Sequence, residues 1–112
     1  MLSLGFRPTW LTPDRVWRLA ATASLAMADA AEHVAALPAG VIRLKWPNDL
    51  VAEGADGVRK LAGVLGETDG LGGPDPRAII GLGLNTDWAL ADFPPELAGS
   101  MTSLRYRRGR SA

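Results

Sequence analysis

One long helix-like segment, followed by strand-like segments with short connections, most constrains the fold of this chain. The helix has a start signal at Thr12-Pro13-Asp14, which combines a capping hydroxyl, a proline suited to the first turn and an acid near the positive helix end. Apolar residues then recur at helical spacing from Val16 to Val34, and Pro38 ends the pattern. Parallel strands need a long crossover, which the later connections do not provide. The sequence therefore predicts an α+β fold with one packed helix and a largely antiparallel sheet.

Five segments have the composition of strands, and turn-forming residues separate them. Residues 2–7 alternate loosely, with Leu2, Leu4 and Phe6 on one face. The other four are short apolar runs at 41–45, 50–52, 60–65 and 78–85. The helix carries seven alanines between positions 20 and 31, which suggests that it approaches the sheet closely. Pro94-Pro95 predicts one further short turn of helix.

The composition excludes several classes of protein. The 112 residues suffice for one small domain. The absence of cysteine excludes a disulfide framework and a Cys-based zinc site, and a single histidine, His33, excludes a His-rich metal centre. Twelve basic and twelve acidic residues cancel, which argues against a uniformly basic nucleic-acid binder. No apolar run reaches the ~20 residues that span a bilayer, and no signal peptide opens the chain, so we expect a cytoplasmic protein.

The first candidate site is Lys45-Trp46-Pro47-Asn48-Asp49, which leaves a strand at a rigid bend. Proline cannot donate to a strand ladder, and Asn and Asp favour turns. Such a bend can direct the amide of Asn48 and the carboxylate of Asp49 toward a ligand or a metal ion. An ordinary turn is the alternative, because these two residue types often bond their own backbone.

The second candidate site is Lys60, which stands at the mouth of an apolar strand containing Gly63 and Gly66. Glycine has no side chain, so a ligand can approach the backbone closely. A lysine held beside such a strand can neutralise a phosphate or a carboxylate. The alternative is a surface lysine at a strand end, which is the commoner situation for a lysine taken singly.

The third candidate site is the strand around Gly81 and Gly83. It superficially resembles the dinucleotide fingerprint G-x-G-x-x-G, but the third glycine is missing and no helix pattern follows. Alternate glycines leave one face of a strand bare, which offers a floor for a flat ligand. The alternative is close packing of this strand against the alanine-rich helix.

Taken together and in order, these motifs resemble the catalytic domain of biotin protein ligases. The resemblance rests on K-W-P-N-D-L at 45–50, R-K-L-A-G-V-L-G-E at 59–67 and I-G-L-G-L-N at 80–85, and it extends to T-S-L at 102–104. The combination of K-W-P-N-D with a following K-L-A-G is highly specific. The resemblance implies an α+β fold with a mixed, largely antiparallel sheet, similar to class II aminoacyl-tRNA synthetases and lipoate ligases. It also implies that residues 1–112 are part of one catalytic domain.

The resemblance implies a ligase that activates biotin with ATP to biotinyl-5′-AMP, with Mg²⁺ present. The biotin then passes to a lysine of the biotin carboxyl carrier protein domain of a carboxylase. Lys60 matches the family lysine that contacts both the carboxylate and the phosphate, so it is the implied catalytic residue. The implied substrate and nucleotide contacts, with no metal ligand assigned among them, are Lys45, Trp46, Asn48, Asp49, Gly63, Leu65, Gly81, Gly83 and Asn85. The alternatives are a lipoate or octanoate ligase, and a non-catalytic fragment that binds biotin or a carrier.

Some parts of the family pattern are missing from the sequence. In the family an Arg-Gly loop that closes over the adenylate precedes the first strand, and a small barrel domain follows the catalytic domain. We therefore expect this chain to be a partial catalytic domain. No DNA-binding helix-turn-helix pattern is present, so the resemblance implies no repressor activity. Arg105, Arg107, Arg108 and Arg110 form a basic end that we expect to be frayed rather than to bind nucleic acid.

Overall fold

The computed structural model describes residues 1–55 and 57–110, and this part of the chain forms one sheet with a long helix. The strands are β1 (Leu2–Phe6), β2 (Ile42–Lys45), β3 (Asp49–Gly54), β4 (Gly57–Asp69) and β5 (Arg77–Leu84). The long helix is α1 (Trp17–Val34), and the shorter helices are η1 (Pro13–Arg15), η2 (Leu90–Asp92), α2 (Pro95–Ala98) and α3 (Leu104–Arg110). The predicted strands and the predicted helix are all present, which confirms the α+β class.

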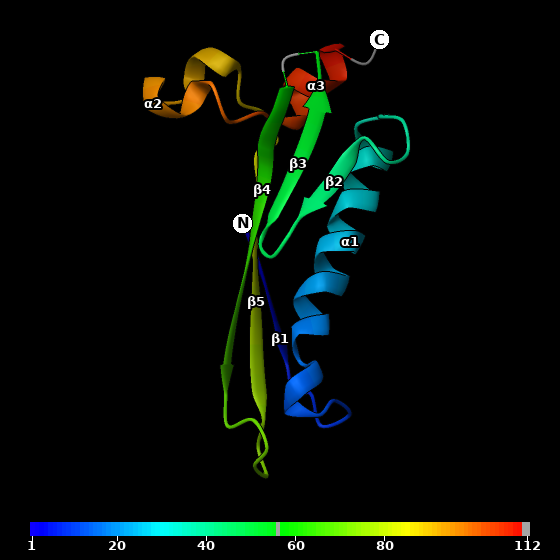
Figure 1. Cartoon of the computed structure of the whole chain (residues 1–112), viewed down its shortest axis with the longest axis vertical. Helices are drawn as coiled ribbons and strands as arrows, with labels where there is room; N and C mark the ends of the chain where they lie inside the picture. Colours follow the sequence, from blue (N-terminus) through cyan, green and yellow to red (C-terminus); the bar gives the residue numbers. More distant parts are fainter. Residues whose placement is uncertain (56, 111–112) are drawn as a thin grey trace.

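The sheet has the strand order β1-β5-β4-β3-β2, and each neighbouring pair is antiparallel. The largely antiparallel sheet is therefore confirmed. Strands β2 to β5 follow one another as hairpins, and β4 and β5 form a long arm at one end of the molecule (Figure 1). Because β1 and β2 lie at opposite edges, α1, which connects them, crosses one face of the sheet.

The long helix begins later than the sequence predicts. Residues Pro13–Arg15 form a 3₁₀ turn, and Thr12 makes no capping hydrogen bond through its side chain. The α-helix starts only at Trp17. A 3₁₀ turn is a frequent way to enter an α-helix, and here it leaves the predicted start signal as a separate turn before α1.

Helix α1 covers one face of the sheet and buries the core there. In β5 the alternate residues Ala78, Ile80 and Leu82 are buried, and the last two pack with Ala23 of α1 and Val64 of β4. A second buried cluster lies toward the other end of α1 and comprises Ala28, Ala31, Ala35, Leu37, Ile42, Leu50, Leu61, Ala62 and Leu104. The alanines let the helix lie close to the sheet, as predicted. The residues between the buried ones in each strand therefore face away from α1.

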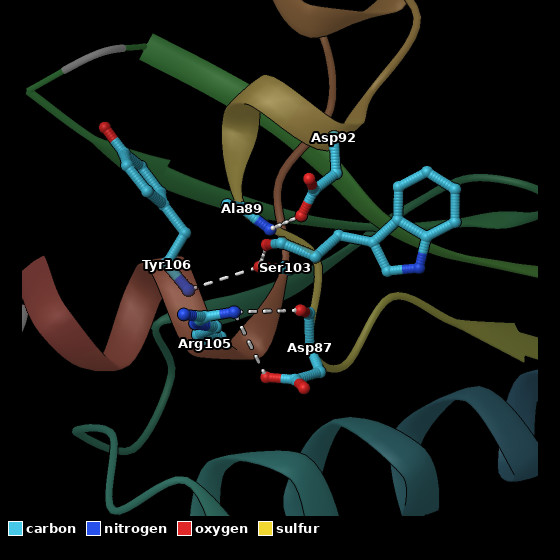
Figure 2. Close-up of polar contacts among 7 residues, drawn as sticks. Asp87, Ala89, Asp92, Ser103, Arg105 and Tyr106 are labelled. Atoms are coloured by element: carbon cyan, nitrogen blue, oxygen red, sulfur yellow. Dashed lines mark hydrogen bonds and ion pairs between the residues drawn. The ribbon is translucent and has the colours of Figure 1, made fainter.

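The C-terminal segment is held by side chains, so the predicted fraying is wrong for residues 105–107. The Ser103 hydroxyl accepts a hydrogen bond from the Tyr106 N–H at 3.2 Å and donates one to the Trp88 carbonyl. Figure 2 shows this serine beside Arg105, whose guanidinium lies 3.7 Å from the Asp87 carboxylate. Arg107 is only 5% exposed and donates to the Thr102 hydroxyl at 3.1 Å. The Trp88 and Asp87 partners lie 15 and 18 residues from Ser103 and Arg105, so the arginines and their sequence neighbours alone could not reveal these contacts.

Substitution of Ser103 tests this anchoring. We expect Ser103→Ala to lower the free energy of unfolding by about 1–2 kcal/mol, because α3 loses its N-cap and a carbonyl loses its donor. Urea unfolding followed by circular dichroism measures the change. Ser100→Ala is the control, since this exposed serine donates only to a neighbouring carbonyl, and we expect a change below about 0.5 kcal/mol. Equal effects of the two substitutions would contradict the capping role.

Candidate functional site

The predicted site residues gather on the face of the sheet that points away from α1, here called the open face. Residues directly opposite each other in paired strands share a face. The cross-strand registers therefore align one row of four predicted residues across β2, β3, β4 and β5: Lys45, Asp49, Gly63 and Gly83. The next row on the same face contains Leu65, Gly81 and Ser3. Motifs that are 35 residues apart in the sequence thus become neighbours.

Three glycines, Gly63, Gly81 and Gly83, form a bare patch on the open face, here called the glycine floor. A Cβ atom built on Gly63 would lie 3.6 Å from the Lys60 ammonium, and one on Gly83 would lie 4.0 Å from Cε of Met1. On Gly81 the nearest atom would be the Leu65 carbonyl oxygen at 3.7 Å. None of these neighbours belongs to α1, so close packing against the helix is not the reason for the glycines. The floor is half-buried backbone without side chains, which a flat ligand can approach.

The side chain of Lys60 extends over this floor. Its Nζ lies 3.6 Å from the Cβ position of Gly63 and 3.3 Å from Oδ1 of Asp49. The Lys60 side chain is 43% exposed and that of Asp49 is 32% exposed, so both are half-buried and open to a ligand from one side. The structure therefore brings together the two motifs that the sequence analysis singled out first, and it does so through a direct ion pair.

A β-bulge places Lys60 on the open face. Two residues three positions apart in a regular strand point to opposite faces, which would separate Lys60 from Gly63. The pairing between β3 and β4 shifts at this point, because Leu50 is opposite Ala62 whereas Val51 is opposite Lys60. Leu61 and Ala62 are consequently both buried on the α1 side. Bulges of this kind redirect side chains near functional sites, and no residue type in the sequence marks this one.

A segment that the sequence analysis did not connect with the site holds the backbone of Lys60. The Lys60 N–H donates to the Ser100 carbonyl at 2.7 Å, and its carbonyl accepts from the Thr102 N–H at 2.8 Å. Arg59 donates to the Ala98 carbonyl at 2.6 Å and strengthens this attachment. The T-S-L motif at 102–104 was the available signal, since Thr102 and Ser103 are fully buried. The C-terminal segment thus stabilises the end of β4 from which Lys60 projects.

The two predicted asparagines contact the protein itself through different groups. The carbonyl of Asn48 accepts a hydrogen bond from the Val64 N–H at 2.7 Å, and its side chain is exposed. The side-chain amide nitrogen of Asn85 donates to the Thr102 carbonyl at 3.2 Å, and its backbone N–H donates to the Leu61 carbonyl at 3.0 Å. Asn85 therefore joins the end of β5 to the segment that frames Lys60.

Trp46 differs from the other predicted contacts in its location. Its ring meets that of Trp17, the first residue of α1, edge to face with centroids 5.6 Å apart. The contact lies with the helix rather than with the glycine floor, and 69% of Trp46 is exposed. Lys45 and Leu65 are also exposed, but both belong to the rows of the open face. The structure thus brings residues of all three predicted motifs together on the open face, whereas the Trp46 ring lies beside Trp17 of α1.

One hollow in the described part of the chain lies away from the glycine floor. An open, mostly apolar depression of about 590 Å³ is lined by Val34, Ala35, Thr86, Asp87, Leu104, Arg105 and Arg108, none of which was predicted for the site. No three His, Cys, Asp or Glu side chains within residues 1–55 and 57–110 are grouped to hold a metal ion. In the same part of the chain no helix has the length and apolar character needed to cross a membrane.

Comparison with known proteins identifies relatives of the same kind as the sequence motifs imply. A biotin–(acetyl-CoA-carboxylase) ligase of Mycobacterium tuberculosis is 35% identical over 97 residues, which are 86% of this chain and 33% of the relative. The bifunctional ligase/repressor BirA of Bacillus subtilis is 31% identical over 108 residues, or 96% of this chain and 31% of the relative. The chain therefore spans about a third of the length of these curated relatives.

The fold has counterparts among solved structures. A biotin protein ligase from Aquifex aeolicus, in complex with biotin and ATP, superposes with a TM-score of 0.70 at 25% identity and covers 98% of this chain and 40% of its own. The unliganded structure of the Aquifex aeolicus ligase gives a TM-score of 0.68. Residues 2–85 match the model of the Biotin/lipoate A/B protein ligase family. These residues contain all five strands and the long helix, and the chain belongs to the biotin/lipoate A/B protein ligase family.

Proposed function

We propose that this chain is part of the catalytic domain of a biotin protein ligase and carries the floor of its biotin and ATP site. The main support is the position of the Lys60 ammonium, which lies over the glycine floor with its Nζ 3.6 Å from the Cβ position of Gly63. A bare strip of backbone leaves room for the fused rings of biotin, and a fixed cation beside it meets the carboxylate. The relatives named as biotin ligases support this choice within the family.

The proposed reaction has two steps, and the chain contributes positioning and charge. In the first step a carboxylate oxygen of biotin forms a bond to the α-phosphorus of ATP, and pyrophosphate leaves as that phosphorus loses its bond to the bridging oxygen. In the second step a lysine amine of the carrier attacks the acyl carbon, and AMP leaves. Two anions must meet in the first step, so a fixed ammonium lowers the barrier where negative charge accumulates. Lys60 fits this role, and the glycine floor orients biotin for the attack.

The described residues do not form a magnesium site by themselves. Asp49 is the one acid among the predicted contacts, and its carboxylate faces the Lys60 ammonium at 3.3 Å. Magnesium in nucleotide sites is typically held by one or two carboxylates together with substrate phosphates and water. We therefore propose that Mg²⁺ enters as part of the MgATP substrate.

The partner and the location follow from the proposed reaction. The carrier is the biotin carboxyl carrier protein domain of a biotin-dependent carboxylase, as the name of the Mycobacterium tuberculosis relative suggests. We place the reaction in the cytoplasm, where ATP and newly made carboxylases are both available. We propose no interaction of this chain with DNA, because the residues of the site recognise a small carboxylic acid and a nucleotide.

Two other functions remain as outcomes of a test. The family includes lipoate ligases, which would take a linear acyl chain in place of biotin. A module that binds biotin or a carrier without forming the adenylate is the second alternative. Both would use the same glycine floor, so the identity of the acid and the release of pyrophosphate separate the three functions.

Incubation of the 112-residue chain with ATP and one acid at a time provides this test. We expect pyrophosphate release and biotinyl-5′-AMP with biotin, and neither with lipoate or octanoate. The measurements are chromatography of α-³²P-labelled ATP for the adenylate, a coupled assay for pyrophosphate, and calorimetric titration of each acid. Adenylation of lipoate would favour the lipoate ligase, and biotin binding without any pyrophosphate would favour the non-catalytic module.

A further inference from the structure

Asp49 is an acid on the otherwise bare open face. It is the first residue of β3, directly after the turn, and faces the floor through its partner Gly63. In the ion pair, the Asp49 side chain is 32% exposed and the Lys60 side chain is 43% exposed. Exposed ion pairs contribute little to stability. Stability therefore does not account for this ion pair, and a role in the candidate site does.

Asp49 lies between two lysines of the open face. It is the cross-strand partner of Lys45 on β2, and its Oδ1 lies 3.3 Å from the Nζ of Lys60 on β4. Directly opposite side chains in an antiparallel pair are close neighbours. The carboxylate thus sits where it offsets the repulsion between two ammonium groups that both border the floor.

The geometry also limits where the Lys60 ammonium can point. A lysine side chain has four flexible carbons and loses rotamer freedom when it is held in one place. The bulge brings Lys60 to the open face, and Gly63 leaves space for its end above the strand. The ion pair with Asp49 then favours the conformer in which the ammonium lies over Gly63 rather than one that extends into solvent. An ammonium has three N–H donors, and the contact with Asp49 is an ion pair at 3.3 Å, so donors remain for incoming anions.

We propose that Asp49 is a positioning residue for Lys60: it holds the ammonium over the glycine floor and leaves N–H donors for the carboxylate and the phosphate of the substrates. The inference rests on the proposed function, because it assigns these donors to biotin and ATP. It differs from the role in nucleotide or metal binding that the family resemblance implies for this residue. In the present proposal Asp49 acts through Lys60 and need not touch ATP.

The first measurement is independent of activity. Brief treatment with acetic anhydride, followed by peptide mass spectrometry, reports how readily the Lys60 amine reacts. We expect Asp49→Asn to increase the rate at Lys60 about threefold or more, since Nζ is no longer held against a carboxylate, while the rate at the amino terminus stays constant. Glu53→Gln is the matched control, because it removes an acid of the same strand that pairs with Arg43 at 3.6 Å. Equal rates at Lys60 in the Asn variant and the unsubstituted chain overturn the proposal.

The second measurement separates positioning from ligand or metal binding. For Asp49→Asn we expect kcat of pyrophosphate release to fall ~10- to 100-fold, the range that a small misplacement of a reacting group produces. KM for ATP and the Mg²⁺ concentration at half-maximal rate should both change by less than about threefold, and Glu53→Gln should leave all three unchanged. An increased Mg²⁺ requirement, or a raised KM with unchanged kcat, overturns the proposal. If the unsubstituted chain releases no pyrophosphate although the Lys60 reactivity responds as expected, the proposed function fails and the positioning of Lys60 by Asp49 stands.

Discussion

Replacement of Lys60 by alanine is expected to lower the rate of biotin adenylation by about 10²–10³-fold, which corresponds to about 3–4 kcal/mol of lost transition-state stabilisation. Negative charge from a carboxylate and a triphosphate accumulates above the glycine floor as the new bond forms. The Lys60 ammonium is the cation that the fold holds there, with Nζ 3.3 Å from Asp49 and 3.6 Å from the Cβ position of Gly63. The observable is pyrophosphate release at saturating biotin and ATP.

The fold should survive this substitution, which makes the result interpretable. The Lys60 side chain is 43% exposed, and loss of an exposed ion pair changes the free energy of unfolding by only about 0–1 kcal/mol. Arg77→Ala serves as the control, since it removes a cation at the far end of β5 that is paired with Asp75. A Lys60→Ala chain that is folded and adenylates biotin at the rate of the Arg77→Ala chain would refute the role of Lys60.

Replacement of Gly83 by valine is expected to abolish biotin binding while the fold is retained. A Cβ on Gly83 meets nothing closer than 4.0 Å, where it reaches the end of Met1, so the new side chain fits the sheet but projects over the floor. Valine is favoured in strands and glycine is not, so the stability should stay the same or rise by up to ~1 kcal/mol. Affinity for biotin should fall by more than ~100-fold, or about 2.8 kcal/mol. Isothermal titration calorimetry and urea unfolding measure the two quantities.

A second glycine on the open face provides the comparison. Gly5 of β1 is opposite Ile79, outside the rows that contain the glycine floor, and a Cβ there meets nothing within 4 Å. Gly5→Val should therefore leave biotin affinity within about twofold while it changes strand propensity in the same way. If both valine variants bind biotin as the unsubstituted chain does, the ligand does not lie on the floor. If both lose binding, the bound ligand extends farther along β5 than the row of Gly83.

Much of the architecture was predictable because it follows from local patterns. The alternation of Ala78, Ile80 and Leu82 with Gly81 and Gly83 indicates one buried face and one bare face, and the structure has both. The short connections after the long helix correctly predict antiparallel pairing. The exact start of α1 was not predictable in this way, because Pro13 and its neighbours suit a 3₁₀ turn as well as the first turn of an α-helix.

The site was predictable as a set of residues but not as a geometry. Sequence motifs identified Lys60, Asp49 and the glycines separately, and each had an ordinary alternative. Only the register of β3, β4 and β5 shows that they share one face, and only the bulge beside Leu61 turns Lys60 toward Gly63. Arg107 illustrates the opposite error: its sequence neighbours suggest a frayed end, whereas it is buried and bonded to Thr102.

The sequence by itself determined the kinds of element, the bare strand faces and the motifs that identify the family, since these depend on residue type and on spacing within a short segment. The tertiary structure decided which face Lys60 occupies, which acid it pairs with, and how the C-terminal segment stabilises the end of β4. These properties depend on strand register, a bulge and contacts between distant segments, where a shift of one residue reverses the direction of a side chain.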